Sequence, residues 1–584
     1  MQDCQRLFDI IYSRNELGPN QIAYAEKDPS NAANSWEKYT VKHTIEMINK
    51  VSNALLNLGI KKDDKIALIS NNRPEWNFID YGVQQIGAVL VPVYPTISES
   101  EYKFIFNDAE VKLCFVSDVE LYQKVVRIKD DVPSLKVVFT IDEVPNARNF
   151  REILADPSKE EILQIESHKK EVDVSDVATI IYTSGTTGTP KGVMLTHGNL
   201  ISNVKAISEV LSIDGGAALS FLPLCHSFER TVSYVYQANG ISAYYAESVD
   251  TVGQNLLEVK PDYFTTVPRL LEKVYEKIMA KGSELKGIKK KLFNWALDLG
   301  HRYELDTDQG FWFDLQLGIA RKLIFSKWKE ALGGNVKAIV TGAAALQPRL
   351  GRVFTAAGIP VVEGYGLTET SPVVTCNLLD EKDRRIGTVG IAIPGVNVKI
   401  AEDGEILTKG PHIMAGYYKR QDLTDEVIDS DGWFHTGDIG TFVEGRFLKI
   451  TDRKKEIFKT SGGKYVAPQP IENTYKESDM IEQIMIIGEY RKFVSALIVP
   501  SFANLSQWCN ERSLGNDSNE EMISHPEFFL YVEGELERLN TDINHVEQVK
   551  KFVLLSEEWS IESGELTPTL KLKRRVIQER YNDH

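Results

Sequence analysis

Short apolar runs alternate with helical patterns through the first half of this chain, and that alternation limits the fold more than any other feature. Residues 65–70, "KIALIS", form a predicted buried strand, and the helix-like "EWNFIDYGVQQIG" and the strand "AVLVPVYP" follow directly. The strands "VKLCFVSD" (111–118) and "LKVVFTID" (135–142) continue the rhythm. Strands that alternate with helices form βαβ units with parallel strands. We therefore predict an α/β fold built on mostly parallel sheets.

Length and composition narrow the class of protein. A chain of 584 residues is too long for one hydrophobic core, so we expect a multi-domain protein. Its 83 Asp and Glu residues exceed 67 Lys and Arg, and the formal charge of −16 argues against broad nucleic-acid binding. Five cysteines without C-x-x-C spacing favour a reducing, cytoplasmic setting with neither a zinc site nor a disulfide framework. We see no signal peptide and no stretch of ~18 apolar residues, so we expect a soluble or at most peripheral protein.

Two regions depart from the alternation. Residues 281–332 contain two amphipathic helical stretches rich in Trp and Lys. Such helices either lie on a membrane or pack on their own domain with a solvated lysine edge, and we favour packing. After the charged turn in 447–468 the pattern changes to short strands such as "QIMIIGE" and "VSALIVP". This change predicts a domain boundary near Asp452, followed by a small α+β domain.

The stretch "TIIYTSGTTGTPKG" (179–192) begins as a strand and then contains only hydroxyl-bearing residues and glycines from Thr183 to Gly188. Backbone N–H groups and hydroxyls of such a loop can surround an anion, with Lys191 as the counter-charge. The Walker pattern G-x-x-x-x-G-K-[ST] does not fit, because Thr189 and Pro190 separate Gly188 from Lys191. Taken alone, the stretch is either a phosphate loop of another kind or a flexible turn.

Four further stretches carry residues suited to nucleotide chemistry. "VVEGYGLTETSP" (361–372) offers Tyr365 to stack on a purine and Glu369 to hold Mg²⁺, although alone it reads as a polar turn. Asp438 in "WFHTGDIG" and Arg453 in "ITDRKKEIFKTSGGKYVAP" suit a ribose or a phosphate. "GELTPTLKLKRR" (564–575) places lysines in a Pro-containing loop that alone reads as a solvated basic tail.

Five motifs in this order, "YTSGTTGTPKG", "EGYGLTET", "HTGDIG", "DRKKEIFKTSGGKYVAP" and "GELTPTLKLKR", closely resemble the adenylate-forming superfamily of acyl-CoA synthetases, luciferases and peptide-synthetase adenylation domains. The resemblance covers nearly the whole chain. Within the superfamily, "LPLCHSFER" (222–230), "TGAAALQP" (341–348) and "TPTLKLKR" look like long-chain fatty acyl-CoA synthetases. The helical segment 281–332 is similar to an insertion that this group carries.

The resemblance implies ATP-dependent activation of a long-chain fatty acid to acyl-AMP, followed by transfer to CoA, which gives acyl-CoA, AMP and pyrophosphate. Mg²⁺ is the implied cofactor, with ATP and CoA as co-substrates. The alternatives are a fatty acyl-AMP ligase that loads a carrier protein, or a CoA ligase for medium-chain or aryl acids. A non-enzymatic membrane-associated scaffold would not need intact catalytic motifs, so we disfavour it. We expect a monomer or homodimer in the cytoplasm, with peripheral contact at the inner face of the membrane through 281–332 as an option.

The same resemblance implies the domains. Residues 1–451 would form the N-terminal AMP-binding and acyl-binding domain, with 281–332 as its insertion. Residues 452–455 would form a hinge centred on Lys455, and 456–584 a mobile C-terminal domain that rotates about it. The rotation would exchange Lys571 for the face that carries Lys459, Gly462 and Gly463.

The implied site residues fall into three sets. Thr183 and Glu369 would hold Mg²⁺, and with Lys191 and Lys571 they form the catalytic set; Lys573 is the alternative to Lys571. ATP or AMP would contact Thr183, Ser184, Gly185, Thr186, Thr187, Gly188, Lys191, Gly342, Glu363, Gly364, Tyr365, Gly366, Thr368, Asp438, Arg453 and Lys571. The acyl chain or CoA would contact His226, Gly342, Ala343, Gly366, Lys459, Gly462 and Gly463.

His226 admits two interpretations from the sequence, a buried structural histidine or a residue that lines the substrate path, and we favour the second. Cys225 precedes it and suggests a Cys–His dyad. Adjacent residues of an extended segment point to opposite faces, so we disfavour the dyad.

Overall fold

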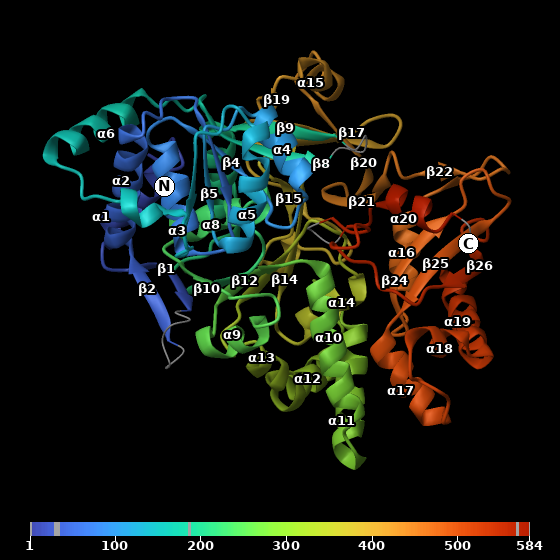
Figure 1. Ribbon diagram of the computed structural model, residues 1–584. Helices are drawn as coiled ribbons and strands as arrows, with labels where there is room; N and C mark the ends of the chain where they lie inside the picture. Colours follow the sequence, from blue (N-terminus) through green and yellow to red (C-terminus); the bar gives the residue numbers. More distant parts are fainter. Residues whose placement is uncertain (1–2, 28–34, 185–188, 568–570, 583–584) are drawn as a thin grey trace. The chain divides into compact units, whose positions relative to one another are not determined.

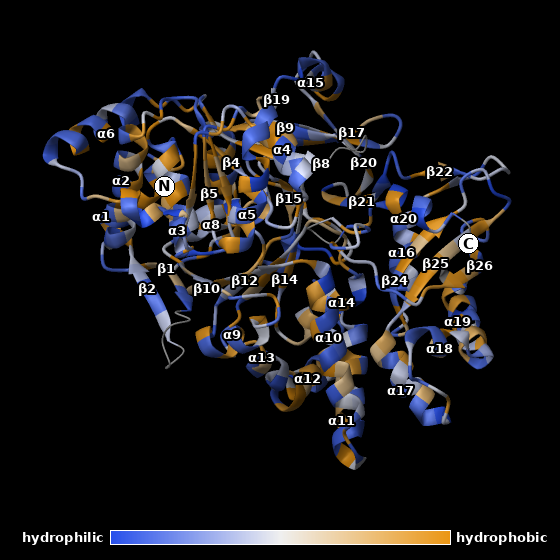
Figure 2. Ribbon diagram, in the orientation of Figure 1, coloured by the Kyte–Doolittle hydropathy of each residue, from blue (hydrophilic) through white to orange (hydrophobic). Residues whose placement is uncertain are grey.

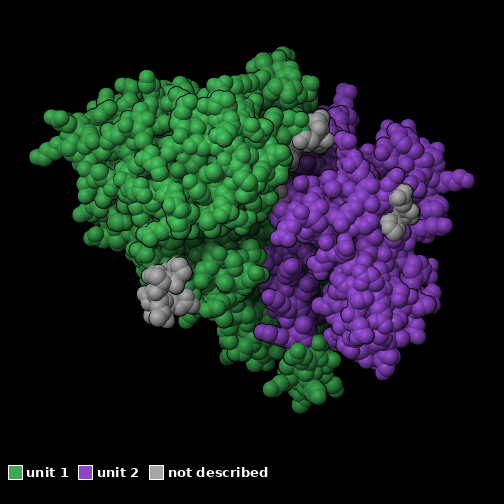
Figure 3. All heavy atoms as spheres, in the orientation of Figure 1, with its two compact units in different colours: residues 1–267, 282–398, 408–435 green, residues 268–281, 399–407, 436–584 purple. Residues whose placement is uncertain are grey.

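The computed structural model describes residues 3–27, 35–184, 189–567 and 571–582. It divides into two compact units, coloured separately in Figure 3. Unit 1 comprises residues 1–267, 282–398 and 408–435, and unit 2 comprises residues 268–281, 399–407 and 436–584.

Unit 1 contains an eight-stranded sheet in the order β19-β9-β8-β4-β3-β5-β6-β7. All neighbouring pairs from β8 to β7 are parallel, whereas β9 and β19 add antiparallel pairs at the other end (Figure 1). The strands are β3 Lys65–Ile69, β4 Val89–Pro92, β5 Leu113–Val116, β6 Val137–Thr140, β7 Arg148–Asn149, β8 Val177–Ser184, β9 Pro190–Thr196 and β19 Gly416–Tyr417.

The second sheet of unit 1 has nine strands in the order β16-β15-β14-β13-β12-β10-β11-β1-β2. Its central strands, from β14 to β1, are parallel, and its three outer pairs are antiparallel. The strands are β1 Ile22–Lys27, β2 Trp36–Thr40, β10 Ala217–Ser220, β11 Ser242–Tyr245, β12 Tyr263–Thr266, β13 Ala338–Thr341, β14 Val361–Gly366, β15 Val373–Cys376 and β16 Ile391–Ala392. The predicted α/β class with mostly parallel sheets is confirmed.

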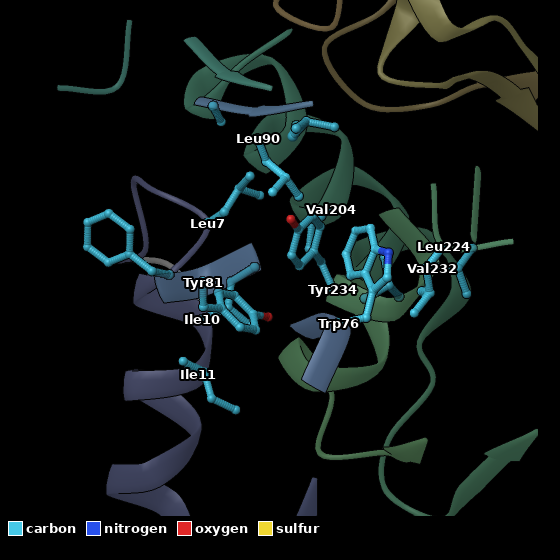
Figure 4. Close-up of a cluster of buried hydrophobic side chains, with 14 of the residues drawn as sticks. Leu7, Ile10, Ile11, Trp76, Tyr81, Leu90, Val204, Leu224, Val232 and Tyr234 are labelled. Atoms are coloured by element: carbon cyan, nitrogen blue, oxygen red, sulfur yellow. The ribbon is translucent and has the colours of Figure 1, made fainter. Parts of the chain in front are cut away.

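Helix α3 (Pro74–Gln84) is fully buried and helix α8 (Ser227–Ala238) is largely buried, and together they bond to both sheets. Arg230 on α8 donates to the side chains of Asp80 on α3 and Thr179 on β8, at 2.5 and 2.7 Å. On the other side, Asn77 of α3 donates to Tyr245 of β11 at 2.6 Å. A helix buried all round belongs inside a core. Figure 4 shows apolar residues of this core, including Trp76, Tyr81, Val232 and Tyr234.

Polar side chains fix the starts of several outer helices. Thr40 caps α2 by accepting from the His43 N–H, and Ser98 and Glu101 form a reciprocal capping box at α4. The outer helices of unit 1 are α1 Asp9–Leu17, α2 Val41–Asn57, α4 Glu99–Asp108, α5 Val119–Ile128, α6 Lys159–Glu171, α7 His197–Leu211, α9 Val252–Val259, α14 Pro348–Ala356 and α15 Gln421–Val427.

The helical stretches predicted within 281–332 are present. Helix α11 spans Gly287–Arg302, and α12 (Phe311–Ala320) continues through a π-helical turn η3 (Arg321–Phe325) into α13 (Ser326–Ala331). Trp328 of α13 is buried and meets Phe354 of α14 edge-on, so this region packs on unit 1. None of the described helices is both long enough and apolar enough to cross a membrane.

Unit 2 is built around three small sheets and its own apolar core. Most residues of the four-stranded sheet β17-β18-β20-β21 belong to it, as do the hairpin β22-β23 and the sheet β24-β25-β26. The strands are β17 Asn397–Ile400, β18 Glu405–Lys409, β20 Phe434–Val443, β21 Phe447–Arg453, β22 Phe458–Lys459, β23 Tyr465–Val466, β24 Ile481–Ile487, β25 Val494–Pro500 and β26 Val549–Leu554. The helices are α10 Pro268–Ser283, α16 Pro468–Tyr475, α17 Phe502–Arg512, α18 Asn519–Ser524, α19 Pro526–Leu539 and α20 Arg574–Arg580.

Candidate active site

Thr183 and Lys191 are paired across an antiparallel hairpin of β8 and β9. The strand continues two residues beyond its predicted end at Tyr182 and closes with the pair Ser184 and Pro190. Strand pairing therefore holds Thr183 and Lys191, both predicted to bind an anion, at the end of the hairpin where β8 connects to β9. The predicted loop residues Gly185, Thr186, Thr187 and Gly188 lie outside the described residues.

Segment 414–418 links this hairpin to the turn that carries Glu369. Its first residue, Met414, donates from its backbone to the Glu369 carbonyl at 2.9 Å, and Tyr418 donates to the Gly192 carbonyl at 2.7 Å. Between them, β19 pairs in register with β9. Glu369 itself lies in a 3-10 turn, η4 (Thr368–Thr370). Backbone bonds therefore hold the predicted phosphate lysine and the predicted metal carboxylate in one part of unit 1.

Tyr417 lies between these two charged side chains. Its hydroxyl donates to Glu369 Oε1 at 2.9 Å, and the Lys191 ammonium lies 5.1 Å from the centre of its ring. Burial and the neighbouring carboxylate raise the pKa of the Tyr417 phenol well above its ordinary value, so it stays a donor. Sequence reasoning missed this residue, because nothing in "AGYYKR" distinguishes it from an ordinary strand tyrosine.

Glu363 and Tyr365 lie on β14, directly before the Glu369 turn, and both are buried. Glu363 Oε1 accepts from the Leu346 N–H at 3.1 Å, and burial raises the pKa of its carboxyl to about 8. The predicted Gly364 lies between them on the same strand. At Gly366 a side-chain Cβ would lie 1.7 Å from the Pro372 carbonyl oxygen, so only glycine fits there.

Gly342, Ala343 and Thr368 surround the same strand end. Gly342 and Ala343 directly follow β13, the parallel neighbour of β14, and Ala343 has a positive φ of 67°. A Cβ on Gly342 would lie 3.1 Å from the Gly364 carbonyl oxygen. The Thr368 hydroxyl lies 3.3 Å from that of Ser227, which begins α8. The predicted residues of 341–369 are thus brought together at the carboxyl ends of neighbouring strands, where α/β proteins commonly bind ligands.

His226 is the N-cap of α8, and its Nδ1 accepts from the Phe228 N–H at 3.1 Å. The segment before His226 is a loop, because β10 stops at Ser220. Cys225 is buried, and burial raises the pKa of its thiol well above the ordinary value. A thiol of this kind is a poor nucleophile. The N-cap role of His226 is one that its sequence context did not indicate.

In unit 2, strand register brings Asp438 and Arg453 together. They are directly paired across β20 and β21, and Arg453 Nε lies 3.4 Å from Asp438 Oδ1. Asp438 lies within β20, which continues to Val443. The Asp438 side chain is 7% exposed and that of Arg453 is 42% exposed. A carboxylate and a guanidinium are thus presented side by side on this sheet.

The expected hinge residue, Lys455, is exposed in the turn that follows β21. Its neighbour Lys454 is held by Asp403 and Glu405, at 2.6 and 2.8 Å. Lys459, Gly462 and Gly463 lie in the exposed hairpin β22-β23. The turn of this hairpin is closed by bonds between Thr460 and Lys464.

Lys571 is hydrogen-bonded to Thr567 near the C-terminus. Its carbonyl accepts from the Thr567 N–H at 2.8 Å, and its N–H donates to the Thr567 hydroxyl at 3.0 Å. Arg574, three residues on, binds Glu472 at 2.6 Å and Glu456 at 3.0 Å. These ion pairs hold the start of α20 against Glu456, which directly follows Lys455 in the chain.

Comparisons with known proteins extend over nearly the whole chain. Residues 15–418 match the model of the AMP-binding enzyme family, and residues 455–584 match its AMP-binding enzyme C-terminal domain. The long-chain-fatty-acid–CoA ligase FadD15 of Mycobacterium bovis is 32% identical over 94% of this chain and 91% of its own. Human long-chain-fatty-acid–CoA ligase 1 is 33% identical over 93% of this chain and 81% of its own. Long chain acyl-CoA synthetase 3 of Arabidopsis thaliana is 32% identical over 99% of this chain and 91% of its own.

Solved structures share the fold. The adenylation domain of a carboxylate reductase from Mycobacterium chelonae superposes with a TM-score of 0.77 at 20% identity, covering 99% of this chain and 90% of that one. A fatty acyl CoA synthetase from Mycobacterium tuberculosis superposes with a TM-score of 0.64 at 21% identity, covering 99% of both chains. With both family models matched in order and relatives above 30% identity along most of its length, the chain belongs to the AMP-binding enzyme family.

Proposed function

We propose that this protein is an AMP-forming long-chain fatty acid–CoA ligase. The observation that carries the proposal is the cluster of Thr183, Lys191, Tyr417 and Glu369, which strand pairing and β19 hold together in unit 1. Relatives named as long-chain fatty acid–CoA ligases or synthetases, at 32 to 33% identity over most of the chain, support the choice of acid and thiol.

The chemistry explains why a nucleotide is needed. A thiol cannot displace oxide from a carboxylate, so the carboxylate must first gain a better leaving group. Its oxygen attacks the α-phosphorus of ATP, the bond to pyrophosphate breaks, and acyl-AMP forms. The CoA thiol then attacks the acyl carbon, releases AMP and gives up its proton. The first step needs positioning and charge neutralisation more than covalent help from the protein.

The unit 1 residues suit the nucleotide's phosphates and base. In the proposal, Lys191 and the loop from Thr183 neutralise the β- and γ-phosphates. The Thr183 hydroxyl and the Glu369 carboxylate supply the hard oxygen ligands that Mg²⁺ prefers. Bound there, Mg²⁺ would neutralise charge on the phosphates during displacement. Tyr365 would flank the adenine. Glu363, which burial keeps largely protonated at neutral pH, would offer both a donor and an acceptor to the base.

Around the same strand ends, the proposal assigns Gly342, Ala343, Gly364, Gly366 and Thr368 to the walls of the nucleotide and acyl sites. Small residues there leave room for a ligand close to the backbone. His226 would line the acyl path in addition to capping α8.

Unit 2 would complete the reaction. In the proposal, Asp438 accepts from the ribose hydroxyls, Arg453 contacts the same sugar or its phosphate, and Lys571 bridges the carboxylate and the α-phosphate. We further propose the domains 1–451 and 456–584 with a hinge at 452–455, so that rotation at Lys455 brings Lys459, Gly462 and Gly463 to the thiol. Unit 2 of the structure begins earlier, at residue 436, and includes 399–407, so the hinge lies inside it.

The proposal is tested by two assays on one preparation. Fatty-acid-dependent ATP–pyrophosphate exchange measures acyl-AMP formation, and addition of CoA should then release AMP and acyl-CoA. A series of acids from hexanoate to icosanoate should show the highest kcat/KM for the long chains. Exchange without thioester formation would instead favour a ligase that loads a carrier protein. A preference for aryl or short acids would contradict the substrate class.

Tyr417→Phe tests the link between Lys191 and Glu369. The ring under Lys191 remains, but the hydrogen bond to the carboxylate is lost, and such a bond is worth about 1.5 to 3 kcal/mol. We expect the Mg²⁺ concentration for half-maximal pyrophosphate exchange to rise about 10-fold, with the exchange rate largely restored at saturating Mg²⁺. Tyr418→Phe is the matched control, since its ring lies near Lys65 and Lys419 instead. An unchanged Mg²⁺ midpoint in Tyr417→Phe would contradict this role.

Two His226 variants separate its cap from its place on the acyl path. Asn is a good N-cap and Ala is not, so His226→Ala should lose about 1 kcal/mol of stability that His226→Asn retains. Both variants lack the imidazole and should raise the KM for the fatty acid alike. Denaturant unfolding and initial rates give the two readouts. A normal KM in His226→Asn would limit His226 to capping.

A further inference from the structure

An uncovered apolar stripe runs along α12 and onto the turn η3 that follows it. Five large apolar side chains on it are exposed: Phe311 by 73%, Trp312 by 71%, Leu315 by 43%, Ile319 by 44% and Leu323 by 52%. At about 100° per residue they fall within an arc of about 120° on one side of the helix. Figure 2 shows apolar residues of α12 in orange.

This stripe is separate from the face that packs α12 into unit 1. Leu317 and Ala320 are buried and point away from the stripe by the same helical spacing. On the packed side, Trp295 of α11 donates to Gln316 at 3.3 Å. The helix already buries an apolar face, so the exposed stripe is extra surface that packing within the described part of unit 1 does not use.

The charge near the stripe is opposite to that of the chain. Residues 281–332 hold ten Lys and Arg against seven Asp and Glu, whereas the whole chain holds 67 against 83. Lys322 is exposed on η3, directly beside Leu323. At the start of α11, which packs against α12 and η3, Lys289, Lys290 and Lys291 are exposed next to Ile288, itself 77% exposed.

We propose that this stripe docks the protein on the surface of an anionic lipid bilayer. Phe and Trp insert at the headgroup level, aliphatic residues follow them, and lysines meet the lipid phosphates. Each Lys near such a surface strengthens binding about 5-fold. A second copy of the chain fits less well, since a symmetric dimer through this face would set basic segments against each other.

The inference does not depend on the ligase reaction, although long-chain acids partition into bilayers and would be concentrated there. Binding is measured by sedimentation with vesicles of phosphatidylcholine, alone or with phosphatidylglycerol, in the absence of ATP, CoA and fatty acid. Its outcome is thus independent of the enzyme assays. We expect wild-type protein to sediment with the mixed vesicles and much less with the neutral ones, and to be released by salt.

The double variant Trp312→Ser/Leu315→Ser should bind the mixed vesicles at least ~10-fold more weakly, because it removes two of the inserted side chains. Leu163→Ser is the matched control, since Leu163 is 70% exposed but lies on α6. Lys322→Gln should lower binding about 5-fold on mixed vesicles and leave binding to neutral ones unchanged. All variants should unfold at the wild-type denaturant concentration, since the changed side chains are on the surface.

Two results would overturn the proposal. One is wild-type protein that fails to sediment with mixed vesicles, and the other is a double variant that binds them as the wild type does. Sedimentation velocity adds a third test: a wild-type dimer that the double variant abolishes would assign the stripe to a second copy instead.

Discussion

Glu369→Gln is expected to lower fatty-acid-dependent pyrophosphate exchange by ~10²-fold or more. The amide keeps the shape of the side chain and can still accept from Tyr417, which now donates to Glu369 Oε1 at 2.9 Å. What it loses is the negative charge that would hold Mg²⁺ beside the phosphates. Losing one such electrostatic contact at a reacting centre commonly costs this much in rate.

The measurement is pyrophosphate exchange as a function of Mg²⁺ concentration. Glu426→Gln is the control, because Glu426 is an exposed glutamate on α15, a short distance along the chain from Tyr417, and should change nothing. Near wild-type exchange by Glu369→Gln at saturating Mg²⁺ would remove Glu369 from the metal site. Circular dichroism of the variant should match the wild type, since the side chain is only partly buried.

Lys571→Ala should lower acyl-AMP formation by ~10²-fold or more and largely spare the second half-reaction. A lysine that bridges the carboxylate and the α-phosphate neutralises charge that develops in the first step. Thioester formation from preformed acyl-AMP and CoA does not develop that charge. Pyrophosphate exchange and release of acyl-CoA from synthetic acyl-AMP follow the two steps separately.

Lys573→Ala is the built-in control, because Lys573 lies two residues on and its N–H donates to the Glu565 carbonyl at 2.7 Å. It should leave both half-reactions near the wild-type rate. If Lys573→Ala instead showed the adenylation defect, the bridging lysine would be Lys573. Equal loss of both steps in Lys571→Ala would contradict a role confined to adenylation.

The sequence predicts the sheets well because buried parallel strands are continuous apolar runs. "KIALIS" and "LKVVFTID" hold the strands β3 and β6 for this reason. The pairing of Asp438 with Arg453 could not be predicted, since it depends on the register of β20 against β21. Each residue belongs to a separate motif of the sequence, and the fold sets the two opposite each other.

Tyr417 and His226 show where sequence reasoning falls short. Tyr417 acts through tertiary contacts to residues 48 and 226 positions away, and no local pattern encodes such contacts. His226 caps a helix through its imidazole nitrogen, whereas Ser, Thr, Asp and Asn are the usual capping signals. Both roles depend on contacts that form only in the folded chain.

The extent of unit 2 is another feature that the sequence alone did not predict. A change of pattern in 447–468 suggested the boundary near Asp452, but residues 399–407 are fastened to the later part of the chain by specific bonds. Thr436 donates to the Ile406 carbonyl at 2.7 Å, and the Gly437 N–H donates to Glu405 at 2.9 Å. Composition along the chain does not report such long-range pairing, which decides where a compact unit begins.

Tracing the carboxylate oxygens of the fatty acid tests the acyl-adenylate route most directly. A fatty acid with ¹⁸O in both carboxylate positions is incubated with the protein, ATP and CoA, and the products are analysed by mass spectrometry. In the proposed route the attacking oxygen stays on the α-phosphorus when the thiol breaks the acyl C–O bond. Each AMP should then carry one heavy oxygen, each acyl-CoA should keep the other, and pyrophosphate should carry none. Unlabelled AMP, or label in inorganic phosphate formed together with ADP, would contradict an acyl-adenylate intermediate.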